Sequence, residues 1–324
     1  MITLPQFWAT LIVFALAVYV VLDGFDLGVG ILLGLTDNDE QRNLMLRTIE
    51  PVWDGNETWL IVVGASLYGA FPLAYSIYLP AFYLGIVVLM LALIFRGIGL
   101  EFRHRSKRRY SWWSKTVCYA SVAAAFVQGA MMGAIIKGIR VENGQFSGDS
   151  LDWVSWFAGI AGVAAVCGYA LHGLAWLIIK TEGSTRDWAY SRLPTLLAIW
   201  LLLLSGLVSY TLLTEVTIME RWGKPSVLWI VPVIMAVISA TLLMGIKQRR
   251  DELPFLMTSM LLVLAAVTFF LSIRPFMVPW VITVEKAAAP ETSLSFLLFG
   301  GVIVMPIILI YTCVVYWVIR GKVQ

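Results

Sequence analysis

The sequence predicts an all-α integral membrane protein with nine transmembrane helices. Three observations lead to this fold class. Hydrophobic residues make up 60% of the 324-residue chain and charged residues only 13%, whereas a soluble domain carries about 25% charged residues. Apolar runs of about twenty residues recur along the chain, and each is long enough to cross a bilayer core of roughly 30 Å. Polar and apolar residues do not alternate in these runs, which excludes a transmembrane β-barrel.

The nine apolar runs follow one another along the whole chain, so we interpret residues 1–324 as a single membrane domain. Pro51, Pro225 and Pro254 lie near the starts of three runs, where the missing N–H group of proline does little harm. The predicted helices are Phe7–Leu35, Val52–Phe71, Ser76–Phe102, Thr116–Lys137, Trp153–Lys180, Leu193–Glu215, Ser226–Ile246, Pro254–Arg274 and Ser293–Ile319.

The basic residues predict the orientation of these helices. The segments after the first, third, fifth and seventh helices, together with the C-terminus, hold sixteen of the 23 Lys and Arg residues, and the opposite segments hold six. Cytoplasmic loops carry the excess of Lys and Arg, so we expect the N-terminus outside and the C-terminus in the cytoplasm. The small net charge of +3 indicates orientation rather than nucleic-acid binding. The densest basic cluster is Arg103, Arg105, Lys107, Arg108, Arg109 and Lys115.

The first helix carries two acidic residues, Asp23 and Asp26, in its cytoplasmic half. An acid at membrane depth costs at least a few kcal/mol unless it faces protein or water. The two residues are three apart, so they share one face of the helix. Small residues four apart allow another helix backbone to come close, and the helix has two such pairs, formed by Gly24, Gly28, Gly30 and Gly34. We therefore expect this part of the helix to be buried in protein.

The second helix begins with two more acids, Asp54 and Glu57, which are also three residues apart. One interpretation is that they only complement the dipole of the helix N-terminus, which contributes about 0.3–1 kcal/mol each. The other is a hydrated proton relay from the cytoplasm, with Asp54 and Glu57 near the surface and Asp23 and Asp26 deeper. Carboxylates suit a relay because their surroundings decide whether they hold a proton.

Arg96 and His172 are the other notable ionisable residues inside predicted helices. Arg96 either reaches the membrane surface with its long side chain or pairs with an acid at similar depth. We predict that His172 is hydrogen-bonded within the bundle, and we predict no haem site, because the other histidine, His104, lies in the basic loop. The three cysteines fall in apolar helices, which predicts small buried residues rather than a disulfide framework or a metal cluster: Cys118, Cys167 and Cys313.

Two acidic motifs carry a family resemblance. The first is Asp23-Gly-Phe-Asp26-Leu-Gly-Val-Gly30, and the second is Pro51-Val-Trp53-Asp54-Gly-Asn56-Glu-Thr-Trp59. Together they resemble subunit II of cytochrome bd-type quinol oxidases. The segment Asn56-Glu-Thr-Trp59 and the loop Lys180-Thr-Glu-Gly183 look more like the cyanide-insensitive branch. Further matches extend the resemblance over the whole chain, at Phe95-Arg96-Gly97, Pro306, Tyr311-Thr312 and Arg320-Gly-Lys322.

The resemblance implies an enzyme complex of the bacterial cytoplasmic (inner) membrane that oxidises quinol, reduces oxygen to water and generates proton motive force. Subunit I, the partner, would carry two b-type haems, a d-type haem where present, and the quinol site, and this chain would ligate no haem. The implied fold is two four-helix bundles plus one peripheral helix, with 7–137 as the first bundle and 153–324 as the remaining five helices. A quinone bound in this chain, lipids and a small single-helix subunit are further expected partners.

The resemblance also implies roles for individual residues. Asp54 matches the carboxylate in the proton route from the cytoplasm to the haems, and Asp23 and Asp26 match the acids near that route. With Glu57 they make up the predicted proton pathway. Trp59 matches a tryptophan at the mouth of the oxygen channel, with helix packing as the alternative.

Two other functions stay open from the residues alone. A stand-alone proton-coupled transporter would also place acids in the membrane, but it would usually show inverted repeats and broken helices near the midplane, which the sequence does not show. A structural scaffold would use the acids only as helix caps and inter-helix contacts. The oxidase subunit is the function that the sequence favours.

Overall fold

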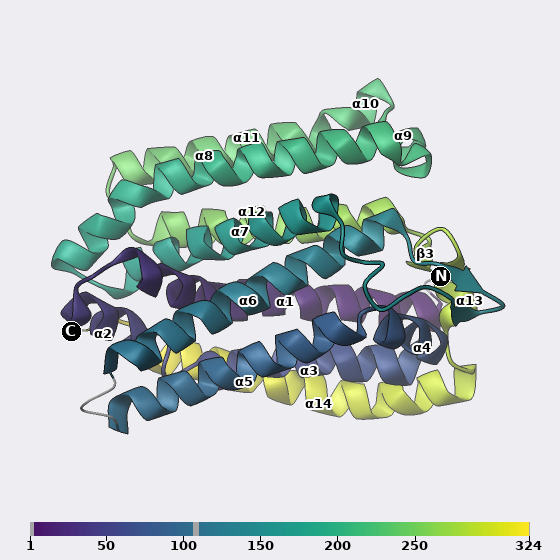
Figure 1. Cartoon of the computed structure of the whole chain (residues 1–324), viewed down its shortest axis with the longest axis horizontal. Coiled ribbons are helices and arrows are strands. Elements are labelled where there is room, and N and C mark those ends of the chain that lie inside the picture. Colours follow the sequence, from purple (N-terminus) through teal and green to yellow (C-terminus); the bar gives the residue numbers. More distant parts are fainter. Residues whose placement is uncertain (1–2, 106–109, 324) are drawn as a thin grey trace.

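The computed structural model describes residues 3–105 and 110–323 of the protein. Its long helices run nearly side by side, and the two ends of the chain lie at opposite ends of these helices (Figure 1). Three residues of the predicted basic cluster, Lys107, Arg108 and Arg109, lie outside the described residues.

The first half of the chain supplies most of the lower part of the stack in Figure 1. Its elements are α1 (Leu4–Leu32), the 3-10 turn η1 (Leu33–Leu35), α2 (Asp39–Arg47), α3 (Trp53–Ala70), α4 (Pro72–Ala81), α5 (Tyr83–Arg105) and α6 (Tyr110–Lys137). A short antiparallel hairpin of β1 (Val141–Glu142) and β2 (Gln145–Phe146) leads to the second half.

The second half continues with long helices and closes with one that returns beside α3 and α1 (Figure 1). Its helices are α7 (Trp156–Lys180), α8 (Gly183–Thr214), α9 (Val216–Trp222), α10 (Pro225–Leu228), α11 (Ile230–Lys247), α12 (Glu252–Ile273), α13 (Val284–Ala287) and α14 (Glu291–Val318). A second antiparallel hairpin, β3 (Phe276–Val278) and β4 (Ile282–Thr283), precedes α13.

Eight helices of the described chain are long and apolar enough to cross a membrane. They are α1, α5, α6, α7, α8, α11, α12 and α14, and the described residues contain a further helix of 18 residues, α3. This helix is less apolar because its first two turns carry Asp54, Asn56 and Glu57. It nevertheless lies alongside the other long helices (Figure 1).

Several predicted helices have different bounds in the structure, and two of them show the physical reasons. The predicted helix Ser76–Phe102 is divided, because α4 ends at Ala81 and α5 begins at Tyr83. Pro80 lies in the last turn of α4, and proline lacks an N–H group and disturbs the helix around it. The helix predicted to begin at Leu193 begins at Gly183, because its first turns are polar and hydrophobicity alone does not reveal them.

The structure also contains a short polar helix, α2, that the apolar pattern did not predict. Asn38 caps it, since its side-chain oxygen accepts hydrogen bonds from the backbone N–H groups of Glu40 (2.9 Å) and Gln41 (3.1 Å). An Asn followed by acids is an ordinary helix start.

The expectation of buried cysteines is wrong for Cys313, which is exposed on α14, while Cys118 and Cys167 are partly buried.

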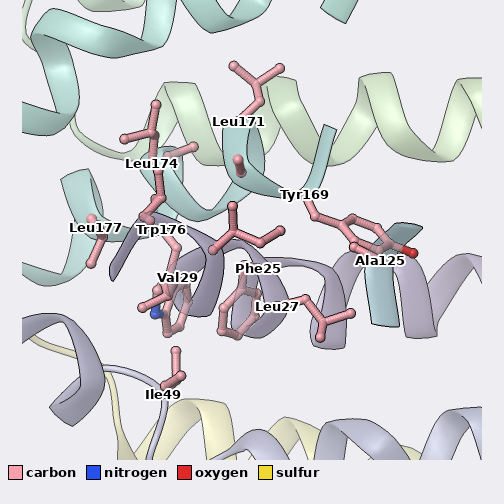
Figure 2. Packing of buried hydrophobic residues seen from close by; sticks show 14 of the residues in the cluster. Phe25, Leu27, Val29, Ile49, Ala125, Tyr169, Leu171, Leu174, Trp176 and Leu177 are labelled. Carbon is pink, nitrogen blue, oxygen red and sulfur yellow. The ribbon is translucent and has the colours of Figure 1, made fainter. Parts of the chain in front are cut away.

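The C-terminal half of α1 is the centre of the core, as its glycines predict. Every residue from Asp23 to Leu32 is buried. A Cβ atom added to Gly28 would lie 1.9 Å from the carbonyl oxygen of Tyr169, so only glycine permits α1 and α7 to cross this closely. Figure 2 shows apolar side chains from both helices, among them Phe25 and Trp176, packed together at this crossing. The prediction that this part of the helix is buried in protein is confirmed.

α14 is the least buried of the long apolar helices in the described chain. Leu294 is its one buried residue within the described chain. Just before the helix starts, the backbone N–H of Ala289 donates to the carbonyl of Ala70 at 2.9 Å, and the Trp8 indole N–H donates to the Leu294 carbonyl at 3.2 Å. The rest of α14 leaves a long apolar surface uncovered by this chain.

Candidate functional site

A buried charge cluster forms where α1, α3 and α5 meet. The Arg96 Nη2 atom of α5 donates to Asp23 Oδ1 of α1 at 2.7 Å and also to a carboxylate oxygen of Glu57 on α3. The side chains of Arg96 and Asp23 are 1% and 0% exposed, whereas that of Glu57 is 21% exposed. Of the two interpretations of Arg96, the structure supports pairing with acids rather than extension to the membrane surface. Glu57 connects the pair to the surface.

Asp26 joins the cluster through an amide. The Asn56 Nδ2 atom donates to Asp26 Oδ2 at 2.7 Å and to the Leu22 carbonyl at 3.3 Å. The Tyr316 hydroxyl of α14 donates to Asn56 Oδ1 at 3.0 Å. Asn56 therefore uses both faces of its amide to connect three helices. The sequence contained Asn56 in the motif, but its type and spacing alone did not identify this bridging role.

Several atoms of the cluster have no protein partner. Within the described residues, Asp23 Oδ2, Asp26 Oδ1, and the Nε and Nη1 atoms of Arg96 are buried and make no hydrogen bond. Buried polar groups are normally satisfied by protein or by ordered water, because an unsatisfied one is costly. A membrane-buried group of this composition has the chemistry to bind water and to exchange protons.

The cluster contains more carboxyl groups than cationic groups. Three carboxyls, Asp23, Asp26 and Glu57, gather around the single guanidinium of Arg96. A charge buried without an opposite charge is strongly unfavourable. One cation can neutralise one carboxylate, so the arrangement favours a proton on at least one of the other two.

Asp54 and Trp59 lie apart from this cluster. Asp54 is exposed on α3, and it shares one stripe of that helix with the exposed residues Ile61 and Tyr68. Trp59 is fully buried against Ala15 and Tyr19. The sequence placed Asp54 and Glu57 in the same helical turn, but the structure directs only Glu57 towards Arg96.

Comparisons with known proteins identify the family. A family model described as cytochrome bd terminal oxidase subunit II matches residues 4–319. The chain belongs to this family. The motif resemblance at Asp23–Gly30 and Pro51–Trp59 is thereby confirmed at the level of the family, and its assignment to the cyanide-insensitive branch stays a prediction.

Relatives match the subunit II chain over nearly its full length. It is 25% identical over 356 residues to cytochrome bd-I ubiquinol oxidase subunit 2 of Escherichia coli (strain K12), covering 98% of this chain and 94% of the relative. It is 27% identical to a probable cytochrome oxidase subunit 2 of Haemophilus influenzae, with the same coverage. The structure of bd oxidase from Geobacillus thermodenitrificans shares the fold, with a TM-score of 0.77 at 15% identity, covering 98% and 99% of the two chains.

His172 of the subunit II chain is hydrogen-bonded inside the bundle, as predicted. Its Nε2 atom lies 3.0 Å from the Val21 carbonyl of α1, and its Nδ1 atom lies 2.8 Å from the Thr258 hydroxyl of α12. The ring also stacks on Phe255 at 4.8 Å. Because a carbonyl only accepts hydrogen bonds, Nε2 carries a hydrogen. His172 connects α7 to α1 and α12.

A second cluster binds the C-terminal tail to the loops after α7 and α11, and we call it the C-terminal clasp. Asp251, between α11 and α12, accepts hydrogen bonds from Arg186 (2.6 and 2.8 Å), Tyr190 (2.8 Å) and Lys322 (2.6 Å). Burial raises the pKa of Asp251, but these hydrogen bonds outweigh it and hold the pKa below its ordinary value. Lys180 donates to the carbonyls of residues 319 and 321 at 2.5 and 3.2 Å. The clasp therefore fixes the tail that follows α14.

No group of three or more His, Cys, Asp or Glu side chains in the described part of the chain is arranged to hold a metal ion. The site that can be built from these residues is thus defined by its carboxyls, its amide and its guanidinium.

Proposed function

We propose that this chain is subunit II of a bd-type terminal quinol oxidase, which supports a haem-bearing subunit I and supplies a proton route from the cytoplasm. The observation that carries the proposal is the charge cluster of Asp23, Asp26, Glu57 and Arg96. It is buried between helices, it has more carboxyls than cations, and it reaches the surface at Glu57. Membership of the subunit II family supports the oxidase assignment.

In the proposed route, a proton enters at Glu57 and reaches the buried acidic group that Asp23 and Asp26 form with Arg96. Asp54 serves the last step, because it is exposed on the side of α3 that this chain leaves uncovered. The exposed stripe of α3 and the uncovered surface of α14 are where subunit I would pack. Asp54 would then face subunit I rather than water.

We propose nine transmembrane spans, the eight apolar helices and α3, with the N-terminus outside and the C-terminus in the cytoplasm. The placement of the two chain ends at opposite ends of the helices supports an odd number of spans (Figure 1). The division into a four-helix bundle over 7–137 and five helices over 153–324 stays a prediction, and α1 packs against helices of both parts.

The remaining assignments follow from the family. Subunit I would hold the b-type haems and, where present, the d-type haem, and the complex would lie in the bacterial inner membrane. A quinone bound in this chain, surrounding lipids and a small single-helix subunit are further proposed partners. Oxygen access at Trp59 would need a path through this chain itself, because Trp59 is fully buried by it.

The test is a pair of variants in the assembled complex, Asp26→Asn and Asp54→Asn. Both remove an exchangeable proton while keeping the shape of the side chain, so we expect the haem absorption spectrum to be kept and quinol-driven oxygen consumption to fall about tenfold or more, which corresponds to about 1.4 kcal/mol in the barrier. Asp149→Asn, in an exposed loop, is the matched control. Native oxygen consumption in both variants would remove the proton route.

A further inference from the structure

A chain of three polar side chains continues from the charge cluster into the bundle. The Tyr169 hydroxyl of α7 donates to Gln128 Oε1 of α6 at 2.9 Å, and Gln128 Nε2 donates to the Tyr19 hydroxyl of α1 at 2.8 Å. Tyr19 and Tyr169 are 1% and 6% exposed. Figure 2 shows Tyr169 extended away from Phe25 and Trp176, towards the segment that carries Ala125. We call this set the Tyr–Gln–Tyr chain, and neither acidic motif contains it.

The hydrogens of the Tyr–Gln–Tyr chain all point towards α1. An amide oxygen only accepts, so Tyr169 must give its hydrogen to Gln128, and Gln128 gives one of its own to Tyr19. The hydroxyl hydrogen of Tyr19 is left for another acceptor. Tyr19 lies one helical turn before Asp23, so the two side chains share one face of α1.

Asp23 has the matching free acceptor. Its Oδ1 atom is used by Arg96, and its Oδ2 atom is buried without a hydrogen-bond partner in the described chain. The Tyr19 hydroxyl, one turn away on the same face of α1, can therefore reach Oδ2 through one bridging water molecule. Asp23 then has both a cation and a hydroxyl donor, and hydrogen bonds to the charged form favour a carboxylate.

Asp26 has a different environment. Its Oδ2 atom accepts from the neutral Asn56 amide, and its Oδ1 atom has no partner among the described residues. The titratable and charged groups that face the two carboxyls from the surrounding helices are Tyr19, Glu57, Arg96, Tyr169 and Tyr316.

We propose that the Tyr–Gln–Tyr chain is a positioning device that fixes Asp23 as the permanent counter-ion of Arg96, so that Asp26 is the carboxyl that exchanges protons. This inference rests on the proposed proton route and assigns different roles to two acids that the sequence motif presents together. The Gln128 amide also ends the route on this side, because an amide donates and accepts hydrogen bonds without releasing a proton at neutral pH.

The first test is infrared spectroscopy of the resting complex, since a protonated carboxyl absorbs apart from a carboxylate. We expect the native complex to show a protonated-carboxyl band that is lost in Asp26→Asn and kept in Asp23→Asn. Loss of the band in Asp23→Asn but not in Asp26→Asn, or a native complex without the band, would overturn the assignment. The measurement needs no turnover, so it stays informative if the oxygen-consumption test of the proposed function fails.

The second test removes the hydroxyl alone. In Tyr19→Phe we expect a second protonated-carboxyl band, from Asp23. We also expect the pH profile of oxygen consumption to shift by about one pH unit. Tyr78→Phe is the matched control. This substitution also removes one tyrosine hydrogen bond, which Tyr78 donates to the Met277 carbonyl at 2.6 Å, outside the cluster. Gln128→Met leaves every charge in place and should repeat the Tyr19→Phe result. If Tyr19→Phe and Gln128→Met both behave like Tyr78→Phe, the positioning role is wrong.

Discussion

The buried charge cluster and the C-terminal clasp are built from the same kinds of side chain in opposite proportions. In the cluster, three carboxyls share the single cation Arg96, and several polar atoms have no partner among the described residues. In the clasp, the single carboxylate of Asp251 receives hydrogen bonds from two cations and a tyrosine. An excess of acids leaves a site that can take up protons, whereas a saturated acid leaves a site that holds segments together.

The largest expected effect comes from removing the cation of the cluster. Arg96→Gln leaves carboxyls buried without their charge partner, and breaking a buried ion pair in this way costs about 3–5 kcal/mol. We expect little assembled complex, and lower thermal stability in what is recovered, measured by yield and by thermal unfolding. Arg249→Gln is the control, because its pair with Asp187 is 54% and 61% exposed and contributes about 1 kcal/mol or less. Equal stability of the two variants would mean that Arg96 does not neutralise the cluster.

A smaller effect is expected from the clasp. Asp251→Asn weakens several charge-assisted hydrogen bonds, and because the site is partly exposed we expect a loss of about 2 kcal/mol in the free energy of unfolding. Oxygen consumption per assembled complex should stay native, since Asp251 lies outside the proposed proton route. A large loss of turnover in a fully assembled Asp251→Asn complex would contradict the division between the two clusters.

The smallest effect is the pH dependence of that loss. The folded pKa of Asp251 lies below its unfolded value of about 3.9, so its contribution to stability is complete above that value and disappears as the pH falls through the folded pKa. The difference in unfolding temperature between native protein and Asp251→Asn should therefore be constant from about pH 8 to about pH 5 and shrink below about pH 4. A difference that grows on acidification would show that Asp251 is not held as the carboxylate.

The same contrast shows what the sequence could predict. Asp23 and Asp26 stand out because acids are rare in apolar helices, and the glycines beside them predict close packing, which the crossing at Gly28 confirms. The helix period does not determine which face of α3 meets which neighbour, so Asp54 and Glu57 looked equivalent although only Glu57 contacts Arg96. Residues such as Asn56 act through partners far away in the sequence, and their pairing depends on tertiary packing rather than on local spacing.

The clasp was missed for a related reason. Lys180, Asp251 and Lys322 are separated by long stretches of chain, and each alone is an ordinary charged residue at the end of a helix. The polar start of α8 was missed because hydrophobicity identifies the apolar run and not the polar turns before it. The division at Pro80 was missed because the apolar run continues through the proline.

The side-chain oxygen of Asn56 accepts a hydrogen bond from Tyr316 of α14, and its amide nitrogen donates hydrogen bonds to α1. The planar amide cannot turn towards one neighbour without losing the other. A sideways movement of α14 would thus reach the Asp26 carboxyl through one rigid group, and a partner that holds α14 in place would also set the orientation of this buried acid.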